Sequence, residues 1–396
     1  MTPLERQSSV SLATLFALRM LGLFLVLPVF ALEAARYPGG DDPARVGLVM
    51  GIYGLTQALL QIPFGLASDR LGRKRVILFG LLLFAAGSFV AAAAQTLDML
   101  LLGRALQGAG AISAAVTALL SDQTRDVVRT KAMAMVGASI GLMFALSLVL
   151  APVLAARIGL NGLFWVTGAL ALTGMALVTW WVPAEPVVSS DASRGSLLAV
   201  LRSPALLRLD LGVFVLHAVQ LAMWVAVPAL LVQAGLSKQE HWSIYLPAVL
   251  GSFVLMGAVF PLERRGYLRA VFLVAIALIA TVQLGLWLVA PVPTVTALGV
   301  LLFVFFCGFN VLEATQPSLV SRLAPVHSRG AALGVYNTLQ SLGFFAGGAL
   351  GGWLAKHVGA NGLFAFCGGA MVLWLLVAWP MTAPGRHVST APAQAA

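Results

Sequence analysis

The sequence predicts an all-α membrane protein with twelve membrane-spanning helices. Of the 396 residues, 60% are hydrophobic and 10% are charged, and the mean hydropathy is +0.96. A water-soluble domain of this composition would lack a polar surface, so lipid must cover much of the chain. Apolar stretches of about 20 residues recur, which is the length that a helix needs to cross roughly 30 Å of hydrocarbon. Strands of a β-barrel would instead alternate in hydrophobicity at every second residue.

Each apolar stretch is interpreted as one spanning helix, and the first is too long for a cleavable signal and lacks a cleavage site. Between the sixth and seventh, "PAEPVVSSDASRGSLLAVLRSP" combines Pro, Ser and charge, which is typical of a linker. The expected parts are an N-terminal six-helix bundle (1–182), a cytoplasmic linker (183–204), a C-terminal six-helix bundle (205–382) and a cytoplasmic tail (383–396). The expected helices are 10–34, 46–66, 76–96, 98–121, 131–156, 160–182, 206–232, 241–261, 268–290, 294–321, 329–355 and 359–381.

The distribution of Lys and Arg predicts that both termini lie in the cytoplasm of a bacterial cell, with the chain in the inner membrane. In this orientation the outer loops hold five basic residues, Arg36, Arg45, Arg157, Lys238 and Lys356. Arg19 and Arg104 lie within helices, which leaves 17 of the 24 Lys and Arg residues on the cytoplasmic side. The net charge of +10 therefore reflects topology, and no basic soluble face remains for nucleic acid. Cys307 and Cys367, two isolated thiols in helices, predict neither a disulfide nor a metal site.

The two bundles repeat each other in sequence. "RIGLNGLF" at 157–164 matches "HVGANGLF" at 357–364, and "DRLGRKR" at 69–75 matches "ERRGYLR" at 263–269. Two similar bundles in parallel orientation predict a cleft between them, with a site near the middle of the bilayer. Such an architecture suits alternating access.

Several motifs give the chain a family resemblance. "GLASDRLGRKR" at 65–75 resembles the loop signature of the major facilitator superfamily, and "GRALQGAGA" at 103–111 is similar to a second signature found mainly in proton-coupled members. With "LRMLGLFLVLPV" and "TRDVVRTKAMA", these strings most resemble YajR-type transporters of the drug:proton antiporter branch. The resemblance implies the major facilitator fold, two pseudo-symmetric six-helix bundles. Because the sequence ends in a short tail, we expect no soluble C-terminal domain of the YajR type.

The resemblance implies that the loop at 65–75 is a conformational latch, which holds the halves together on the inside in the outward-open state. Gly65 and Gly72 permit a tight turn and close helix approach, and Asp69 could meet the N-terminus of the helix at 329–355. Arg73 could pair with Asp122. An alternative is that the basic residues only enforce topology or contact anionic lipid. The latch residues are Gly65, Asp69, Arg70, Gly72, Arg73, Asp122 and Arg129.

Four residues are candidates for proton coupling: Glu313, His217, Arg19 and Arg104. Glu313 is the only acid predicted well inside the hydrocarbon region, where desolvation favours a reversible proton carrier. His217 is a second titratable candidate, although a structural role is equally open. A buried arginine needs a partner, and Gln107 could share the network of Arg104, unless that side chain extends to the headgroups. Glu33 and Glu240 are expected to be solvated.

Aromatic, Met and amide side chains are expected on the face of the central cavity, which suits amphiphilic compounds. They are Met20, Phe24, Tyr53, Gln57, Gln61, Gln107, Met143, Gln220, Met223, Trp224, Asn310, Gln316, Tyr336, Asn337 and Gln340. No nucleotide-binding loop is present, so the expected energy source is the proton gradient, with no cofactor or metal.

The sequence therefore favours a proton-coupled exporter of small amphiphilic molecules, and we expect it to be a monomer. Antiporters of the superfamily usually have Gly before the proline of the fifth helix, whereas Ala151 precedes Pro152 here. A symporter or facilitator for one polar metabolite is thus the alternative. A membrane sensor without transport activity is disfavoured because the chain has no effector module. An enzyme is disfavoured because no nucleophile or metal-ligand spacing is present.

Overall fold

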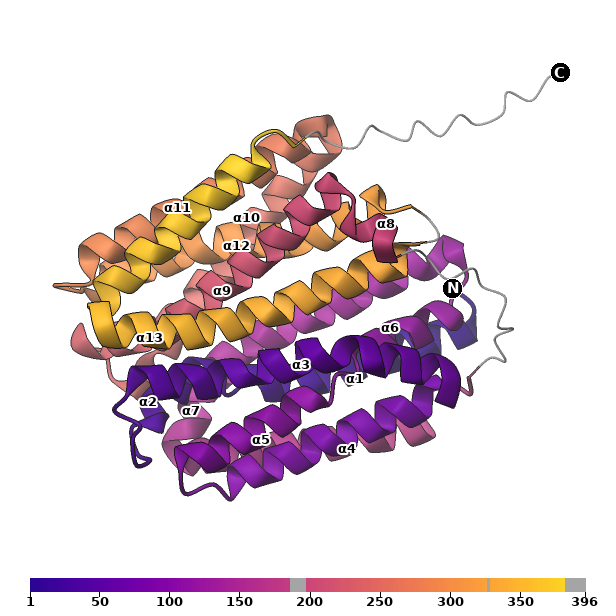
Figure 1. Ribbon diagram of the computed structural model, residues 1–396, viewed down its shortest axis with the longest axis horizontal. Coiled ribbons are helices and arrows are strands. Elements are labelled where there is room, and N and C mark those ends of the chain that lie inside the picture. Colours follow the sequence, from indigo (N-terminus) through magenta and orange to yellow (C-terminus); the bar gives the residue numbers. More distant parts are fainter. Residues whose placement is uncertain (186–196, 326–327, 382–396) are drawn as a thin grey trace.

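The computed structural model describes residues 1–185, 197–325 and 328–381, and within these ranges it contains helices and no strand (Figure 1). The elements of the N-terminal half are α1 Pro3–Phe24, α2 Leu27–Ala34, α3 Pro43–Leu71, α4 Arg73–Ala92, α5 Leu97–Ala109, α6 Ser113–Asp122 and α7 Asp126–Trp180. Those of the C-terminal half are α8 Leu197–Leu201, α9 Pro204–Gln233, a 3₁₀ turn Lys238–Glu240, α10 Trp242–Leu262, a π turn Glu263–Tyr267, α11 Leu268–Val289, α12 Val295–Leu323 and α13 Arg329–Ala378. Most of the linker and the whole tail predicted from the sequence lie outside the described residues.

Ten stretches of the described helices are long and apolar enough to cross a membrane. Two of them, in α7 and α13, run for 54 and 50 residues, and each corresponds to two predicted spans. Gly159 interrupts α7 with φ 67° and ψ −177°, and Gly359 interrupts α13 with φ 70° and ψ −177°. Positive φ favours glycine, and the sequence repeat aligns these two residues. The ribbon of α13 reverses direction within its length in Figure 1. Twelve crossings remain a prediction.

Two predicted helices differ from the structure in their interior. The predicted helix 10–34 begins earlier, at Pro3, and is divided at Leu25–Val26 into α1 and α2, just before Pro28. The predicted helix 98–121 is divided at Gly110–Ile112 into α5 and α6. A Cβ at Gly110 would lie 2.3 Å from the Gly80 carbonyl oxygen, so only glycine fits this approach to α4.

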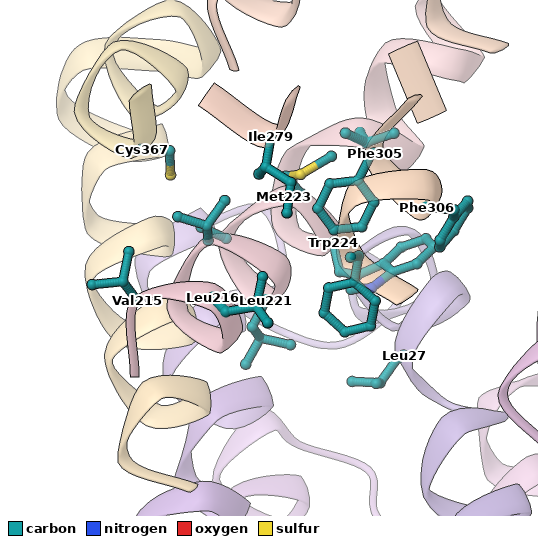
Figure 2. Close-up of a cluster of buried hydrophobic side chains, with 14 of the residues drawn as sticks. Leu27, Val215, Leu216, Leu221, Met223, Trp224, Ile279, Phe305, Phe306 and Cys367 are labelled. Atoms are coloured by element: carbon teal, nitrogen blue, oxygen red, sulfur yellow. The ribbon is translucent and has the colours of Figure 1, made fainter. Parts of the chain in front are cut away.

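The halves lie against each other, the N-terminal half in indigo to magenta and the C-terminal half in rose through orange to yellow (Figure 1). We call the end of the bundle that holds the N-terminus the inner end, and the opposite end the outer end, following the predicted orientation. In the C-terminal half, α9 is the most enclosed helix, and its Met223 and Trp224 pack with Phe305 and Phe306 of α12 (Figure 2). This apolar core fixes α9 and α12 relative to each other.

Helices α3 and α13 bring the two halves into contact toward the outer end. A Cβ at Gly47 would lie 2.2 Å from the Gly348 carbonyl oxygen, and one at Gly352 would lie 2.3 Å from the Pro43 carbonyl oxygen. Near the inner end of α13, by contrast, a Cβ at Gly330 or Gly334 would meet nothing within 4 Å. Small residues therefore allow backbone-to-backbone packing of the halves at the outer end.

Candidate functional site

Three polar side chains from three helices of the C-terminal half meet at mid-depth. His217 Nε2 of α9 lies 3.2 Å from Glu313 Oε2 of α12, and Gln340 Nε2 of α13 lies 2.8 Å from the same imidazole nitrogen. Gln340 also donates to Glu313 Oε1 at 3.4 Å. The His217 side chain is 2% exposed, whereas that of Glu313 is 40% exposed. The sequence predicted these residues separately, and the fold brings all three together.

The hydrogen-bonding pattern fixes the imidazole tautomer. His217 Nδ1 lies 2.9 Å from the Val213 carbonyl oxygen, which can only accept, so Nδ1 carries a hydrogen. In the neutral ring Nε2 is then an acceptor. The donor that this lone pair faces is Gln340 Nε2 at 2.8 Å, and Glu313 Oε2 makes no hydrogen bond among the described residues. The 3.2 Å contact of Nε2 with Oε2 becomes a hydrogen bond only when a proton lies between the two atoms.

Aromatic rings enclose the imidazole. Phe344 and Phe309 contact the His217 ring edge-on, with centroids 4.9 Å and 5.9 Å away. Phe144 of the N-terminal half lies 6.4 Å from Phe309, so this wall reaches the opposite half. Such surroundings exclude water from the imidazole and strengthen its interaction with the carboxyl group.

Arg19 of α1 is 2% exposed and occupies the break between α5 and α6. Its Nη2 donates at 3.2 Å to the Gly110 carbonyl oxygen, which lies in the break and also accepts from the Ile112 backbone nitrogen at 2.9 Å. The same nitrogen donates to the Tyr53 hydroxyl at 3.1 Å, and Nη1 donates to Ser113 Oγ at 3.0 Å. The acceptors that surround this cation are therefore neutral.

Arg104 of α5 is also 2% exposed. Its Nη1 donates to Gln107 Oε1 at 2.9 Å, and Gln107 donates to Ser88 Oγ at 2.8 Å. The guanidinium carbon lies 5.0 Å from the centroid of the Tyr53 ring, a cation–π contact. Tyr53 thus serves both arginines, one through its hydroxyl and one through its ring.

One hydrogen bond joins the Arg19 network to the opposite half. Gln57 Oε1 accepts from Arg19 at 3.4 Å, and Gln57 Nε2 donates to Ser341 Oγ of α13 at 3.1 Å. Ser341 directly follows Gln340, which contacts the Glu313–His217 pair. The cationic network of one half and the Glu313–His217 pair of the other are therefore linked through α13.

Ion pairs also join the halves at the outer end. Lys356 Nζ lies 2.7 Å from Asp42 Oδ2, and Lys238 Nζ lies 3.8 Å from Glu33 Oε1. Glu33 also pairs with Arg36 at 3.1 Å. The expectation that Glu33 is solvated was wrong, because it is 5% exposed and held between cations. Glu240 is exposed, as expected.

The loop between α3 and α4 forms a polar cluster within the N-terminal half. Arg73 pairs with Asp69 and donates from Nε to Asp122 Oδ2 at 3.1 Å. Gly72 has φ 97°, so the turn requires glycine. In the described residues, the partner of Asp69 belongs to its own half rather than to the start of α13. Arg70 is exposed.

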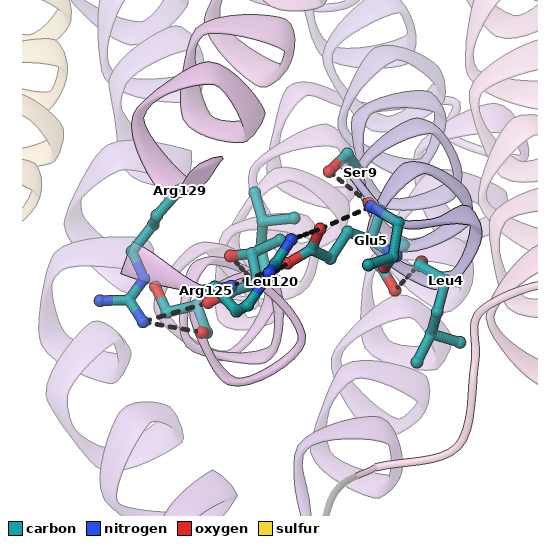
Figure 3. A network of polar contacts seen from close by, with 10 residues as sticks. Leu4, Glu5, Ser9, Leu120, Arg125 and Arg129 are labelled. Carbon is teal, nitrogen blue, oxygen red and sulfur yellow. Dashed lines mark hydrogen bonds and ion pairs between the residues drawn. The ribbon is translucent and has the colours of Figure 1, made fainter. Parts of the chain in front are cut away.

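One expectation about the latch residues was wrong in detail. A Cβ at Gly65 would meet only Ala114 at 3.7 Å, an ordinary contact, so this glycine is not required by a close helix approach. Arg129 donates to the Ser121 and Thr124 carbonyl oxygens, both at 3.2 Å, and so lies at the end of α6 beside Asp122 (Figure 3).

Sequence reasoning missed two acids that hold this inner surface. Glu185 accepts from the backbone nitrogens of Arg73 at 2.8 Å and Lys74 at 2.7 Å, and so caps the N-terminus of α4. Glu5 pairs with Arg125 at 2.7 Å (Figure 3). Helix N-termini attract carboxylates. Gly72 followed by a basic first turn therefore indicates that some acid caps this helix, but it does not indicate which acid.

The cavity candidates fall into three groups. Tyr53, Gln57, Gln107 and Gln340 take part in the networks above, while Asn310 donates to Ser252 Oγ at 2.8 Å. Met223 and Trp224, each 3% exposed, pack in the apolar core and, together with Gln220, line a small hollow beside Phe305. The others are partly or fully buried: Met20, Phe24, Gln61, Met143, Gln316, Tyr336 and Asn337.

A second acid of the C-terminal half is buried within the protein. Asp210 of α9 is 4% exposed and belongs to the same helix as His217. It was overlooked because it lies close to the predicted start of that helix.

Comparison with known families gives residues 12–348 and 318–395 as matches to the Major Facilitator Superfamily. The inner membrane transport protein YajR of Escherichia coli K12 is 44% identical over 398 residues, which cover 97% of this chain and 85% of the relative. The chain belongs to the major facilitator superfamily. It is thus a membrane-spanning transporter, and its relatives are named as transport proteins.

The chain is also similar to a more distant relative and to a solved structure. The multidrug resistance protein MdtL of Shewanella oneidensis is 33% identical over 159 residues, 36% of this chain and 40% of the relative. The crystal structure of the human organic anion transporter MFSD10 matches with a TM-score of 0.70 at 20% identity, covering 95% of this chain and all of that one. The second similarity concerns the fold alone.

Proposed function

We propose that this chain is a proton-coupled secondary transporter that works by alternating access and exports small amphiphilic compounds in exchange for protons. The observation that carries the proposal is the contact of Glu313 with His217 at 3.2 Å. An acid and an imidazole that share one proton change together from a net charge of −1 to neutral when the proton binds. A site of this kind can return the proton after each cycle.

The environment of the pair supports reversible protonation. His217 is enclosed, which keeps its tautomer and position fixed, while the Glu313 side chain is 40% exposed and its Oε2, which faces the imidazole, is buried. Gln340 donates to the carboxyl group and lies against the imidazole, so it holds the two groups in contact. Arg19 and Arg104 are the cations whose field the carboxylate and a bound substrate experience.

The packing of the halves supports alternating access. Close contact of α3 with α13 and the Asp42–Lys356 pair occupy the outer end, whereas the loop cluster of Asp69 and Arg73 keeps its contacts within one half. We take this arrangement as the one that is closed outside. In the opposite arrangement, Asp69 would meet the N-terminus of α13 and act as the latch.

Amphiphilic substrates are supported by the composition of the mid-depth surface. Phe24, Phe144 and Phe309 approach one another there, with Phe24 and Phe144 centroids 5.1 Å apart. Apolar walls with a few polar groups suit molecules that have both characters. The name of the MdtL relative is consistent with this class. The expected setting is the inner membrane, with both termini cytoplasmic and the chain a monomer.

The test compares Glu313→Gln with the unchanged protein in proteoliposomes. A panel of fluorescent amphiphilic dyes is screened for movement driven by an imposed pH gradient. We expect Glu313→Gln, which mimics the protonated acid, to abolish uphill dye movement while downhill exchange and binding persist. Glu240→Gln, at an exposed acid, is the control. Uphill movement in Glu313→Gln with unchanged pH dependence would remove Glu313 from the mechanism.

The alternative is a symporter or facilitator for one polar metabolite, and Ala151 before Pro152 is the observation that favours it. Ala151 is fully buried in α7, where antiporters of the superfamily usually have Gly. The direction of proton flow decides between the two functions. Protons that move with the substrate, or no proton movement, would support the alternative.

A further inference from the structure

Asp210 of α9 is a buried acid that the proposed site does not use. It is 4% exposed, and its Oδ2 has no hydrogen-bond partner among the described residues. No cation forms an ion pair with it in this part of the chain. An acid enclosed in this way is expected to hold a proton or to be hydrated, because an unpaired carboxylate is costly to bury.

The helices place Asp210 on the inner side of the Glu313–His217 pair. Asp210 precedes His217 by seven residues, so it lies two turns away on the same face of α9, about 10 Å toward the inner end. Tyr336 precedes Gln340 by four residues and therefore lies one turn toward the inner end on the face of α13 that meets His217. Its side chain is thus at an intermediate depth.

Buried polar atoms without partners lie at this intermediate depth. Tyr336 is 3% exposed and its hydroxyl has no hydrogen-bond partner, and Gln316 of α12 is fully buried with both amide atoms unpartnered. Gln316 follows Glu313 by three residues, one turn toward the inner end. Tyr336 lies near both Glu313 and Asp210. Buried polar atoms of this kind are normally hydrated.

We propose that Asp210 is a second proton-binding residue, and that water held by Tyr336 and Gln316 conducts protons between Asp210 and the Glu313–His217 pair. The route rests on the proposed proton coupling and gives it a direction, from the pair toward the inner end. In each transfer the Glu313 carboxyl or the imidazolium gives its proton to a water molecule. Asp210 accepts a proton from the other end of the water chain and releases it to bulk water.

The charged groups around this route allow Asp210 both to accept and to release a proton. The described titratable groups that face it are Tyr336, Glu313 and His217, while α8, which also packs on the inner part of α9, has no titratable residue. The acids of the neighbouring α2 and α3 have cations of their own, Glu33 with Arg36 and Asp69 with Arg73. Asp210 is therefore free of a fixed cation that would hold it permanently ionised.

The test measures how fast the pair gains a proton. Purified full-length protein is subjected to a pH jump, and the infrared band of the protonated Glu313 carboxyl, identified by its loss in Glu313→Gln, is followed in time. We expect Asp210→Asn to slow the appearance of this band at least tenfold without a comparable change in its equilibrium titration. Tyr336→Phe, which keeps the ring, should slow it to a smaller extent. Asp98→Asn, at an exposed outer acid, should have no effect.

Each outcome has a separate meaning. If both variants match the unchanged protein in rate, Asp210 and Tyr336 are not on the route and the inference fails while the proton pair stands. If no carboxyl band depends on Glu313 in the unchanged protein, the proposed proton pair fails and the route fails with it. Thermal unfolding and elution volume identify a variant that does not fold, and Tyr336→Phe then decides alone.

Discussion

At the scale of single residues, the N-terminal half keeps two arginines inside without a carboxylate beside them. Tyr53 contacts both, because its hydroxyl accepts from Arg19 at 3.1 Å and its ring lies 5.0 Å from the guanidinium carbon of Arg104. Neutral acceptors bind both terminal nitrogens of Arg19, while its Nε has no hydrogen-bond partner among the described residues. Since a buried cation is stabilised only when its donors are satisfied, the hydroxyl of Tyr53 is a structural requirement as well as a link between the two sites.

Tyr53→Phe removes the hydroxyl and keeps the ring. We expect a loss of about 1.5–3 kcal/mol of stability, the usual range for a hydrogen bond to a charged group. The midpoint of thermal unfolding in detergent measures it. Tyr267→Phe, at a tyrosine that is 59% exposed, is the matched control. Equal midpoints for the two variants would mean that Arg19 is satisfied without Tyr53.

At the scale of helices, the contact of α3 with α13 depends on glycine on both sides. A Cβ at Gly348 would lie 2.5 Å from the Gly47 carbonyl oxygen and 2.8 Å from Gly51. These atoms are backbone and cannot move aside by a change of rotamer. The two helices can therefore approach at the outer end only while these positions lack side chains.

Gly348→Ala should force α3 and α13 apart and shift the protein toward arrangements that are open outside. Spin labels at Gln95 and Val292, both exposed on outer loops, would report a longer distance between the halves. Gly369→Ala lies on the same helix where a Cβ meets nothing within 4 Å, and should leave the distance unchanged. An unchanged distance in Gly348→Ala would show that the close packing is dispensable.

The helices could be predicted from the sequence because each is a long apolar run, and features that depend on tertiary contacts could not. The break at Gly110–Ile112 has no proline to announce it, and it becomes necessary only because α4 and Arg19 approach there. The Glu313–His217–Gln340 contact joins three helices whose facing sides no local pattern specifies. Glu185 could be suspected as a polar residue near a helix start, but its partner lies 112 residues away in the chain.

At the scale of the whole molecule, opposite ends carry opposing ion pairs. Asp42–Lys356 joins the halves at the outer end, and the Asp69–Arg73 cluster is the predicted latch of the inner end. The hydrogen bond from Lys356 holds the pKa of Asp42 below its ordinary value of 3.8. The outer pair therefore contributes fully above that pH and is lost only as pH falls through the lowered pKa. It stays ionised over the physiological range, so proton coupling is left to the interior site.

Asp42→Asn and Asp69→Asn should shift the halves in opposite directions. Labels at the exposed residues Val127 and Tyr267 follow the distance at the inner end. Asp42→Asn should shorten it, because the outer contact is weakened, and Asp69→Asn should lengthen it, because the latch is weakened. Neither change in distance should depend on pH between about 6 and 8, because this range lies well above the pKa of Asp42. Shifts in the same direction for both variants would contradict the assignment of the two ends.

The position of Glu185 also sets a tether between the halves. Its carboxylate is bound to the start of α4 in the N-terminal half, while α8, which begins at Leu197, packs on α9 and α13 of the other half. The chain between these two anchors covers twelve Cα-to-Cα steps from Glu185 to Leu197. A fully extended chain of that length reaches about 40 Å, so the anchors cannot separate further in any conformation. While Glu185 caps α4, the length of this segment therefore sets an upper limit on how wide the inner end can open.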